Sequence, residues 1–432
     1  MDFHHIPLRI APHAARNAAA RRYSIFIICA PGSIVKRKAA AAGRDVNFFT
    51  DMARAGANVL YCEQRGGGCM PAQKKKTAVR FGVSGGLLLL CLAAYAAARR
   101  NPAWVTAYYR PVSKAVSGAL GSVFSLVPRV PAAELCVYLL AAALLTKLIL
   151  RLCGRARPPR RGWTDRASRG CLACACALCF FLFAWGLNYF PSPLAGSVGL
   201  TDGDYTEKEL FAAAEHYLDR ANEAAENVAR RPDGTFDSGG YAALAGRAPD
   251  AMRALARRYP VFEGAAAPPK AVIASRVLSR FGITGVYNPF FGECNVNTDV
   301  PDTTLPFTML HEMAHRLGVA PEDEANFAAF LACAESGDPA FAYAGYYHAF
   351  LYCYNALGAQ DRAELAARMG DGLRADCRAA AEHYLQYAGG LEQAGTALND
   401  AYLKALGQAS GVQSYDEAVD LLVAYHAQGG DS

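Results

Sequence analysis

Three long apolar stretches stand out in the hydrophobic and polar pattern of the chain, at residues 82–98, 131–150 and 170–190. The first and third contain no charged residue, and the second contains only two. A helix of about 20 apolar residues, rising about 1.5 Å per residue, spans the hydrocarbon core of a bilayer. The pattern therefore predicts three transmembrane helices. Because no small-residue cleavage site precedes Arg99 and Arg100, we expect the first stretch to be a retained anchor and not a signal sequence.

Basic residues beside these stretches predict their orientation. Residues 151–169 contain seven arginines, and four basic residues precede the first stretch: Lys74, Lys75, Lys76 and Arg80. Cytoplasmic loops carry an excess of Lys and Arg. We therefore expect a multi-pass protein with a cytoplasmic N-terminus, whose chain leaves the third stretch on the extracytoplasmic side. A smaller basic group in the first outer loop favours the opposite orientation: Arg99, Arg100, Arg110 and Lys114.

Two further features are typical of a membrane surface. Residues 104–126 are partly amphipathic, so we expect them to lie in the interface. Trp185 and Tyr189 follow the third apolar run, where an aromatic belt is expected. The predicted membrane region thus runs from about 78 to 190.

Residues outside the membrane region divide into two parts. Residues 1–69 are rich in Ala and Arg and have no sustained periodicity, whereas Met70 leads directly into a lysine run and the first span. We interpret 1–69 as a disordered extension or an artefact of the assigned start codon, with translation beginning at Met70. Residues 195–432 are expected to form one extracytoplasmic domain.

Within that domain the apolar spacing predicts helices at about 206–230 and 241–258, the first opened by the capping box of Thr206 and Glu209. Residues 271–299 differ, because short β-branched and aromatic runs alternate there with Gly and Pro. This pattern predicts short strands. After Asn326 the pattern is helical to the end, in four or five pieces.

The composition of the chain limits which classes of molecule we expect it to bind. Hydrophobic residues make up 53% of the chain and charged residues 19%, with a formal net charge of +6. The excess positive charge lies mostly beside the predicted spans, and no aromatic-basic binding surface is visible. We therefore expect contact with a lipid bilayer and no nucleic-acid partner.

The cysteines do not indicate a second metal site. Four of them spell CxxCxCxxC inside the third apolar stretch, where Cys behaves as a small hydrophobe: Cys171, Cys174, Cys176 and Cys179. Four others lie in the predicted domain, at spacings unlike those of a small disulfide scaffold, so no bridge is predicted: Cys294, Cys333, Cys353 and Cys377.

The segment His311-Glu312-Met313-Ala314-His315 is an HExxH motif. On a helix, positions i and i+4 share a face, so both imidazoles can bind one zinc ion, and the Glu between them lies beside the metal's open position. Apolar residues at helical spacing, with Thr303 and Pro306 before the motif and Gly318 after it, predict such a helix. The alternative is a surface helix with two incidental histidines.

A third protein ligand is needed. A metzincin would have His at position 321, where this chain has Pro, so that assignment fails. The following helix begins with Pro321 and three acids, and the arrangement resembles gluzincin metallopeptidases. The resemblance implies that Glu322 is the third ligand and that Asn326 braces a histidine from behind. Glu324 is the alternative ligand, and an acid-rich helix N-terminus without a metal is a further alternative.

Several short segments together carry a second resemblance: Trp185–Tyr189, Gly285–Pro289, Gly292–Asn297, Leu305–Thr308 into His311–His315, Glu322–Phe327, Tyr343–Tyr346 and Ser414–Glu417. They resemble an uncharacterised family of bacterial membrane proteins, known only as a domain of unknown function. The resemblance covers roughly residues 80–428 and does not reach 1–69. It implies about three N-terminal spans and an external zincin-like domain, and thus a zinc peptidase-like protein in the bacterial cell membrane.

Together these features predict a mainly α protein: three N-terminal transmembrane helices, then an extracytoplasmic α+β zincin-like domain with a small β-sheet. In zincins an edge strand of that sheet binds peptide. The expected reaction is hydrolysis of a peptide or protein outside the membrane, with Zn²⁺ as cofactor and Glu312 as the general base.

A further donor is needed for the negative charge of the reaction intermediate. Tyr346 is our choice from the downstream group Tyr346, Tyr347 and His348, although all three also fit an aromatic core. Glu293 is a further candidate for the cleft, with an ordinary turn carboxylate as the alternative. The alternative function is a non-catalytic membrane sensor or scaffold that retains a zinc site. A transporter is poorly supported, because the spans contain no internal ionisable pair.

Overall fold

The computed structural model describes residues 72–127, 130–154, 162–201, 203–406 and 414–430. The segment 1–69 therefore lies outside the described residues. The fold is mainly helical, with one small three-stranded sheet.

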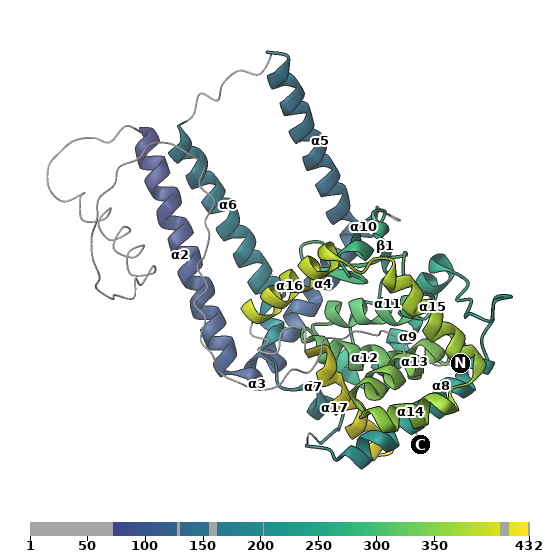
Figure 1. The fold of residues 1–432 in the computed structure, drawn as a ribbon. Coiled ribbons are helices and arrows are strands. Elements are labelled where there is room, and N and C mark those ends of the chain that lie inside the picture. The colour runs from purple at the N-terminus through teal and green to yellow at the C-terminus, as the bar shows by residue number, and fades with distance from the viewer. Residues whose placement is uncertain (1–71, 128–129, 155–161, 202, 407–413, 431–432) are drawn as a thin grey trace, which may run out of the picture.

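Three helices are long and apolar enough to cross a membrane: α2 (Ala72–Arg100), α5 (Ala132–Leu152) and α6 (Trp163–Ala184). They confirm the three predicted apolar helices, although the third ends six residues earlier than expected. Helices α2 and α6 pack against each other, whereas α5 is exposed from Leu135 to its end and stands apart from them (Figure 1). All three project from the same side of the remaining fold (Figure 1).

The chain between the first two spans is helical as well, in three pieces: α3 (Pro102–Trp104), η2 (Val105–Tyr109) and α4 (Arg110–Phe124). Helix α4 packs directly on the fold that follows the third span. The hydroxyl of Tyr287 donates to Ser117 of α4 at 2.8 Å, and the ammonium of Lys114 donates to the carbonyl oxygens of Val261 and Glu263. The predicted membrane region of 78–190 thus contains a helix that belongs to the packing of the domain.

After the third span come five helical elements: η3 (Gly186–Tyr189), α7 (Leu194–Ser197), α8 (Glu207–Glu226), α9 (Tyr241–Arg258) and η4 (Pro260–Phe262). The capping box predicted for α8 is present, because Thr206 accepts from the backbone of Glu209 while the Glu209 carboxylate accepts from the backbone of Thr206. Helix α9 has the predicted bounds.

The sheet lies where short strands were expected, and is built from β1 (Lys270–Ala271), β2 (Gly285–Asn288) and β3 (Glu293–Val296), with α10 (Ser275–Arg280) between the first two. The order is β1-β3-β2, in which β3 pairs parallel to β1 and antiparallel to β2. Strand β2 is therefore an edge, and no described strand pairs with its outer side.

The helices that follow the sheet are α11 (Thr304–Arg316), α12 (Glu322–Ala334), α13 (Pro339–Ala356), α14 (Ala359–Arg368), α15 (Asp371–Leu385), α16 (Gly390–Ala405) and α17 (Ser414–Ala427). Helix α11 is central, because it contacts the sheet on one side and α9, α12 and α13 on others. All of its residues are buried, so the interpretation of the HExxH segment as a surface helix is wrong.

Candidate metal centre

Helix α11 positions the two histidines of the HExxH motif. It begins at Thr304, with Pro306 in its first turn, and ends at Arg316. Gly318 follows in the left-handed conformation, with φ of 78°, as the C-terminal stop predicts. Both His311 and His315 are buried, and their ring centroids are 4.6 Å apart. One turn of helix thus brings both imidazoles to the same point.

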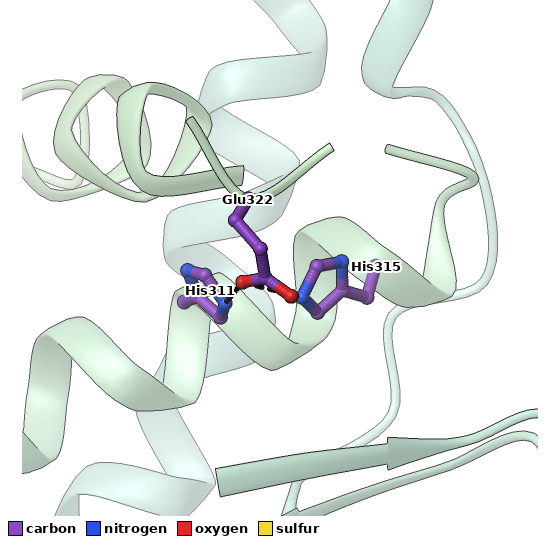
Figure 2. A group of neighbouring side chains, drawn as sticks. All are labelled: His311, His315 and Glu322. Carbon is purple, nitrogen blue, oxygen red and sulfur yellow. Dashed lines mark ion pairs between the residues drawn. The ribbon is translucent and has the colours of Figure 1, made fainter. Parts of the chain in front are cut away.

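The third member of the cluster comes from the first residue of α12. The carboxylate of Glu322 reaches between the two rings, with Oε2 at 3.2 Å from Nε2 of His311 and 3.6 Å from Nε2 of His315 (Figure 2). One ligand atom from each of the three side chains lies within 4.8 Å of the others. No other group of three or more potential metal ligands occurs among the described residues.

The tautomer of His315 is suited to metal binding. Its Nδ1 lies 2.7 Å from the carbonyl oxygen of Val319, which can only accept a hydrogen bond. Nδ1 therefore carries a proton, and when the ring is neutral, as metal binding requires, Nε2 carries the lone pair on the side of Glu322. A backbone carbonyl in this position is a common support for a metal-binding histidine.

Charges within the cluster strongly influence one another. Burial alone would raise the pKa of the Glu322 carboxyl, but His315 and His311 hold it well below its usual range. Burial alone would lower the pKa of His315, yet Glu322 outweighs this effect and raises it to about 9. His315 and Glu322 thus stabilise each other's charged forms.

Glu312 lies beside the cluster with an available oxygen. Burial raises the pKa of its carboxyl. Its Oε2 is buried and has no hydrogen-bond partner among the described residues. Its Oε1 faces Gly285 of the edge strand β2, where any Cβ would overlap that oxygen. Glycine at 285 therefore makes room for the Glu312 carboxylate between α11 and the sheet.

The alternative ligand Glu324 points elsewhere. Its Oε1 accepts a hydrogen bond of 2.7 Å from the backbone of Leu194, and burial raises its pKa to about 7. Helix geometry explains this, because two residues along a helix turn a side chain by about 200°. The predicted support from Asn326 is not observed. Its Nδ2 is buried without a partner, and Val319 fills the role at His315.

Tyr346 is placed differently from the prediction. Its hydroxyl accepts from Arg220 of α8 at 3.3 Å, and that guanidinium also lies over its ring. These contacts direct Tyr346 toward α8 and not toward the metal cluster. His348 stacks on Phe307 at 4.3 Å and Tyr347 is fully packed, as expected of core aromatics.

Glu293 has a structural role and does not line a cleft. It forms a buried ion pair of 2.6 Å with Lys270, and its other oxygen accepts from the backbone of Ala132 at the start of α5. The alternative of an ordinary turn carboxylate does not describe it either, because Glu293 begins strand β3 and is buried. The cysteines of the domain are buried and free: Cys294, Cys333, Cys353 and Cys377.

Two residues near the cluster were missed or misread in the sequence. Trp185 was expected in an aromatic belt, but only 4% of it is exposed, and its indole donates to the carbonyl oxygen of His315 at 2.9 Å. Tyr402 of α16 interacts with the charge of Glu322 and pairs with Tyr189 beyond the third span. Burial raises the pKa of Tyr402, yet 44% of it remains exposed. No local motif marks Tyr402, because it lies 80 residues beyond Glu322.

The profile of a family described as "Protein of unknown function (DUF3810)" matches residues 108–423. The match covers most of the chain, from the end of η2 through two apolar helices and the group of His311, His315 and Glu322, and the chain belongs to this family. No curated protein and no solved structure matches the chain.

Proposed function

We propose that this member of the DUF3810 family is a membrane-anchored, zinc-dependent peptidase with an extracytoplasmic catalytic domain. The observation that carries the proposal is the buried cluster of His311, His315 and Glu322, with the unpartnered carboxylate oxygen of Glu312 beside it. Two imidazoles and one carboxylate are the ligand set of many catalytic zinc sites.

The number of ligands favours a catalytic site over a structural one. A structural zinc is closed by four protein ligands, whereas a catalytic zinc keeps one position open for water. No fourth His, Cys, Asp or Glu joins the cluster among the described residues. The alternative, a sensor or scaffold with a structural zinc, would also have no use for a carboxylate at Glu312.

The chemistry follows from the positions of the side chains. A bound zinc ion supplies Lewis acidity and lowers the pKa of a water molecule that it holds. Glu312, beside the three side chains that would hold the ion, would accept the proton that a water molecule loses when its oxygen bonds to the carbonyl carbon of the peptide. Glu312 would then pass this proton to the nitrogen that departs when the C–N bond breaks. Tyr402 replaces Tyr346 as our candidate for hydrogen bonding to the negative oxygen, because its pKa responds to the charge of Glu322 and 44% of it is exposed.

Strand β2 offers a place for the substrate backbone. It is an edge strand of the sheet, and Gly285 at its start touches the Glu312 carboxylate. An extended peptide that pairs with this edge would pass the metal cluster.

Basic residues support the proposed orientation. The start of α2, the end of α5 and the start of α6 lie at the ends of the spans that are remote from the domain (Figure 1). In sequence, the two basic clusters typical of cytoplasmic loops adjoin these ends. Two of the cations that argued against this orientation have structural partners, since Arg110 donates to the carbonyl oxygen of Gly318 and Lys114 to that of Val261.

The experiment that tests the function uses the full chain, because α4 packs into the domain. Purified wild type and the Glu312→Gln variant are compared for zinc content and for cleavage of a peptide mixture, followed by mass spectrometry. We expect about one zinc per chain in both proteins and a loss of cleavage of at least about a hundredfold in the variant. Equal cleavage by both proteins would refute the mechanism, and zinc binding without any cleavage would favour the sensor or scaffold.

A further inference from the structure

Helix α4 has an apolar face that the protein leaves uncovered. Together with α3 and η2 it exposes a stripe at helical spacing, which includes Trp104, Tyr108, Val112 and Val123. The opposite face is polar or small and is buried against the domain: Arg110, Ser113, Ser117, Gly118 and Gly121. A water-soluble helix has the reverse arrangement. Because α4 lies between two membrane spans in sequence, its exposed stripe is suited to the bilayer surface.

The buried face of α4 contacts the helix that carries the metal cluster. Nε of Arg110 donates to the carbonyl oxygen of Gly318 at 3.1 Å, and the guanidinium of Arg316 fills the space beside Gly121. Packed helices lie about 8–10 Å apart. A single helix layer therefore separates the HExxH helix from the surface on which α4 lies.

The end of the third span approaches the cluster from a second direction. Helix α6 ends at Ala184, and the next residue, Trp185, donates from its indole to the backbone of His315. Tyr189, four residues later, pairs with Tyr402 near Glu322. Two short connections thus tie the metal cluster to the point where the chain leaves the membrane.

The edge strand β2 also connects the third span to the HExxH helix. At its start Gly285 touches the Glu312 carboxylate. In the turn after its end, Phe290 stacks on Phe180 of the third span, with ring centroids 5.4 Å apart. The strand has four residues, which at about 3.3 Å each cover roughly 13 Å. A chain paired with β2 would therefore run from the membrane span to the metal cluster over about four residues.

From this arrangement we propose that the substrate is a membrane-anchored polypeptide, cleaved within a few residues of the bilayer surface. The inference rests on the proposed peptidase function and names its substrate class. An anchored chain leaves the lipid beside Phe290, follows β2 and meets Glu312 after about four residues, whereas a free peptide has no anchor to hold it at this edge. The reaction is the same hydrolysis of one C–N bond by water.

The test uses the full chain in liposomes of phosphatidylethanolamine and phosphatidylglycerol. The probe is a synthetic library with one leucine-rich transmembrane helix followed by a randomised 30-residue tail (about 100 Å when extended). The same tails without the helix are the matched control, and Glu312→Gln is the control for contaminating peptidases. Mass spectrometry identifies each cleaved bond and its distance from the anchor.

We expect cleavage within about eight residues of the anchor, at least about tenfold faster than cleavage of the free tails at equal total concentration. Cleavage spread evenly over the tail, or equal rates for anchored and free tails, would overturn the inference and leave the peptidase function standing. If zinc-loaded wild type cleaves neither library, the peptidase function fails and the inference fails with it.

Discussion

Replacement of Glu322 by Gln is the most direct test of the ligand set. The change keeps the size of the side chain and removes the negative charge of the carboxylate. One oxygen of this carboxylate lies 3.2 Å from Nε2 of His311 and 3.6 Å from Nε2 of His315. Glu324→Gln is a matched control on the same helix. Glu324 is equally buried, at 7% exposed against 9%, but its carboxylate accepts from the backbone of Leu194 and does not face the cluster. A Gln oxygen at 324 can accept that same hydrogen bond.

The expected size of the effect follows from the ligand count. Structural zinc sites with four ligands bind with about 10–16 kcal/mol, so one ligand contributes about 3 kcal/mol, or roughly a hundredfold in affinity. The comparison is made at pH 9, because below this pH zinc must also displace the proton that Glu322 holds on His315 of the wild type. We expect about a hundredfold weaker binding for Glu322→Gln and less than about threefold for Glu324→Gln.

The assay is zinc titration of the full chain against a competing chelator, with circular dichroism to establish that all three proteins are folded. A Glu324→Gln variant that loses zinc while Glu322→Gln retains it would shift the ligand assignment by two residues. If both variants lose zinc affinity equally and only slightly, neither Glu322 nor Glu324 is a zinc ligand.

Three further predictions concern the same region. Because the pKa of His315 is raised to about 9, zinc must displace a proton from this ring at lower pH. The zinc affinity of the wild type should therefore rise about tenfold per pH unit from pH 7 and level off near pH 9. A zinc affinity that is constant from pH 7 upward in the chelator assay would contradict this. Gly285→Ala should lower peptide cleavage at least about tenfold with full zinc content, since the added Cβ displaces the Glu312 carboxylate, and an unchanged rate would remove that contact from the mechanism. Burial lowers the pKa of His348 to about 4, so as pH falls from about 6.5 this histidine becomes protonated in the unfolded chain before it does in the folded protein. The free energy of unfolding, measured with denaturant, should therefore fall by up to about 3 kcal/mol between pH 6.5 and 4. The His348→Phe variant should show a flatter dependence over this pH range.

Features that depend on neighbours in sequence were predictable. The apolar stretches, the capping box at Thr206 and the helix around the HExxH motif follow from residue spacing, and each is present in the structure. The approach of His311 to His315 is of the same kind, because one turn of α-helix sets it. The zinc ion, the peptidase reaction and the side of the membrane remain predictions that the proposed experiments test.

Features that depend on packing between distant segments were not predictable. The sequence did not decide whether Glu322 or Glu324 is the third member of the group. Only the packing of α12 on α11 directs Glu322 toward the histidines and Glu324 toward the backbone of Leu194. Trp185 was expected in an aromatic belt at the membrane surface, yet its indole donates to a carbonyl oxygen 130 residues away in the chain.

Sequence by itself therefore determined which helices form and which side chains share a helix face, because hydrogen bonds and side-chain contacts within four residues control both. Tertiary structure alone decided that Glu322 joins the two histidines, that Tyr346 contacts Arg220 of α8, and that a helix between two spans packs on the HExxH helix. These outcomes depend on how buried surfaces of separate elements fit together, and that fit has no period along the chain.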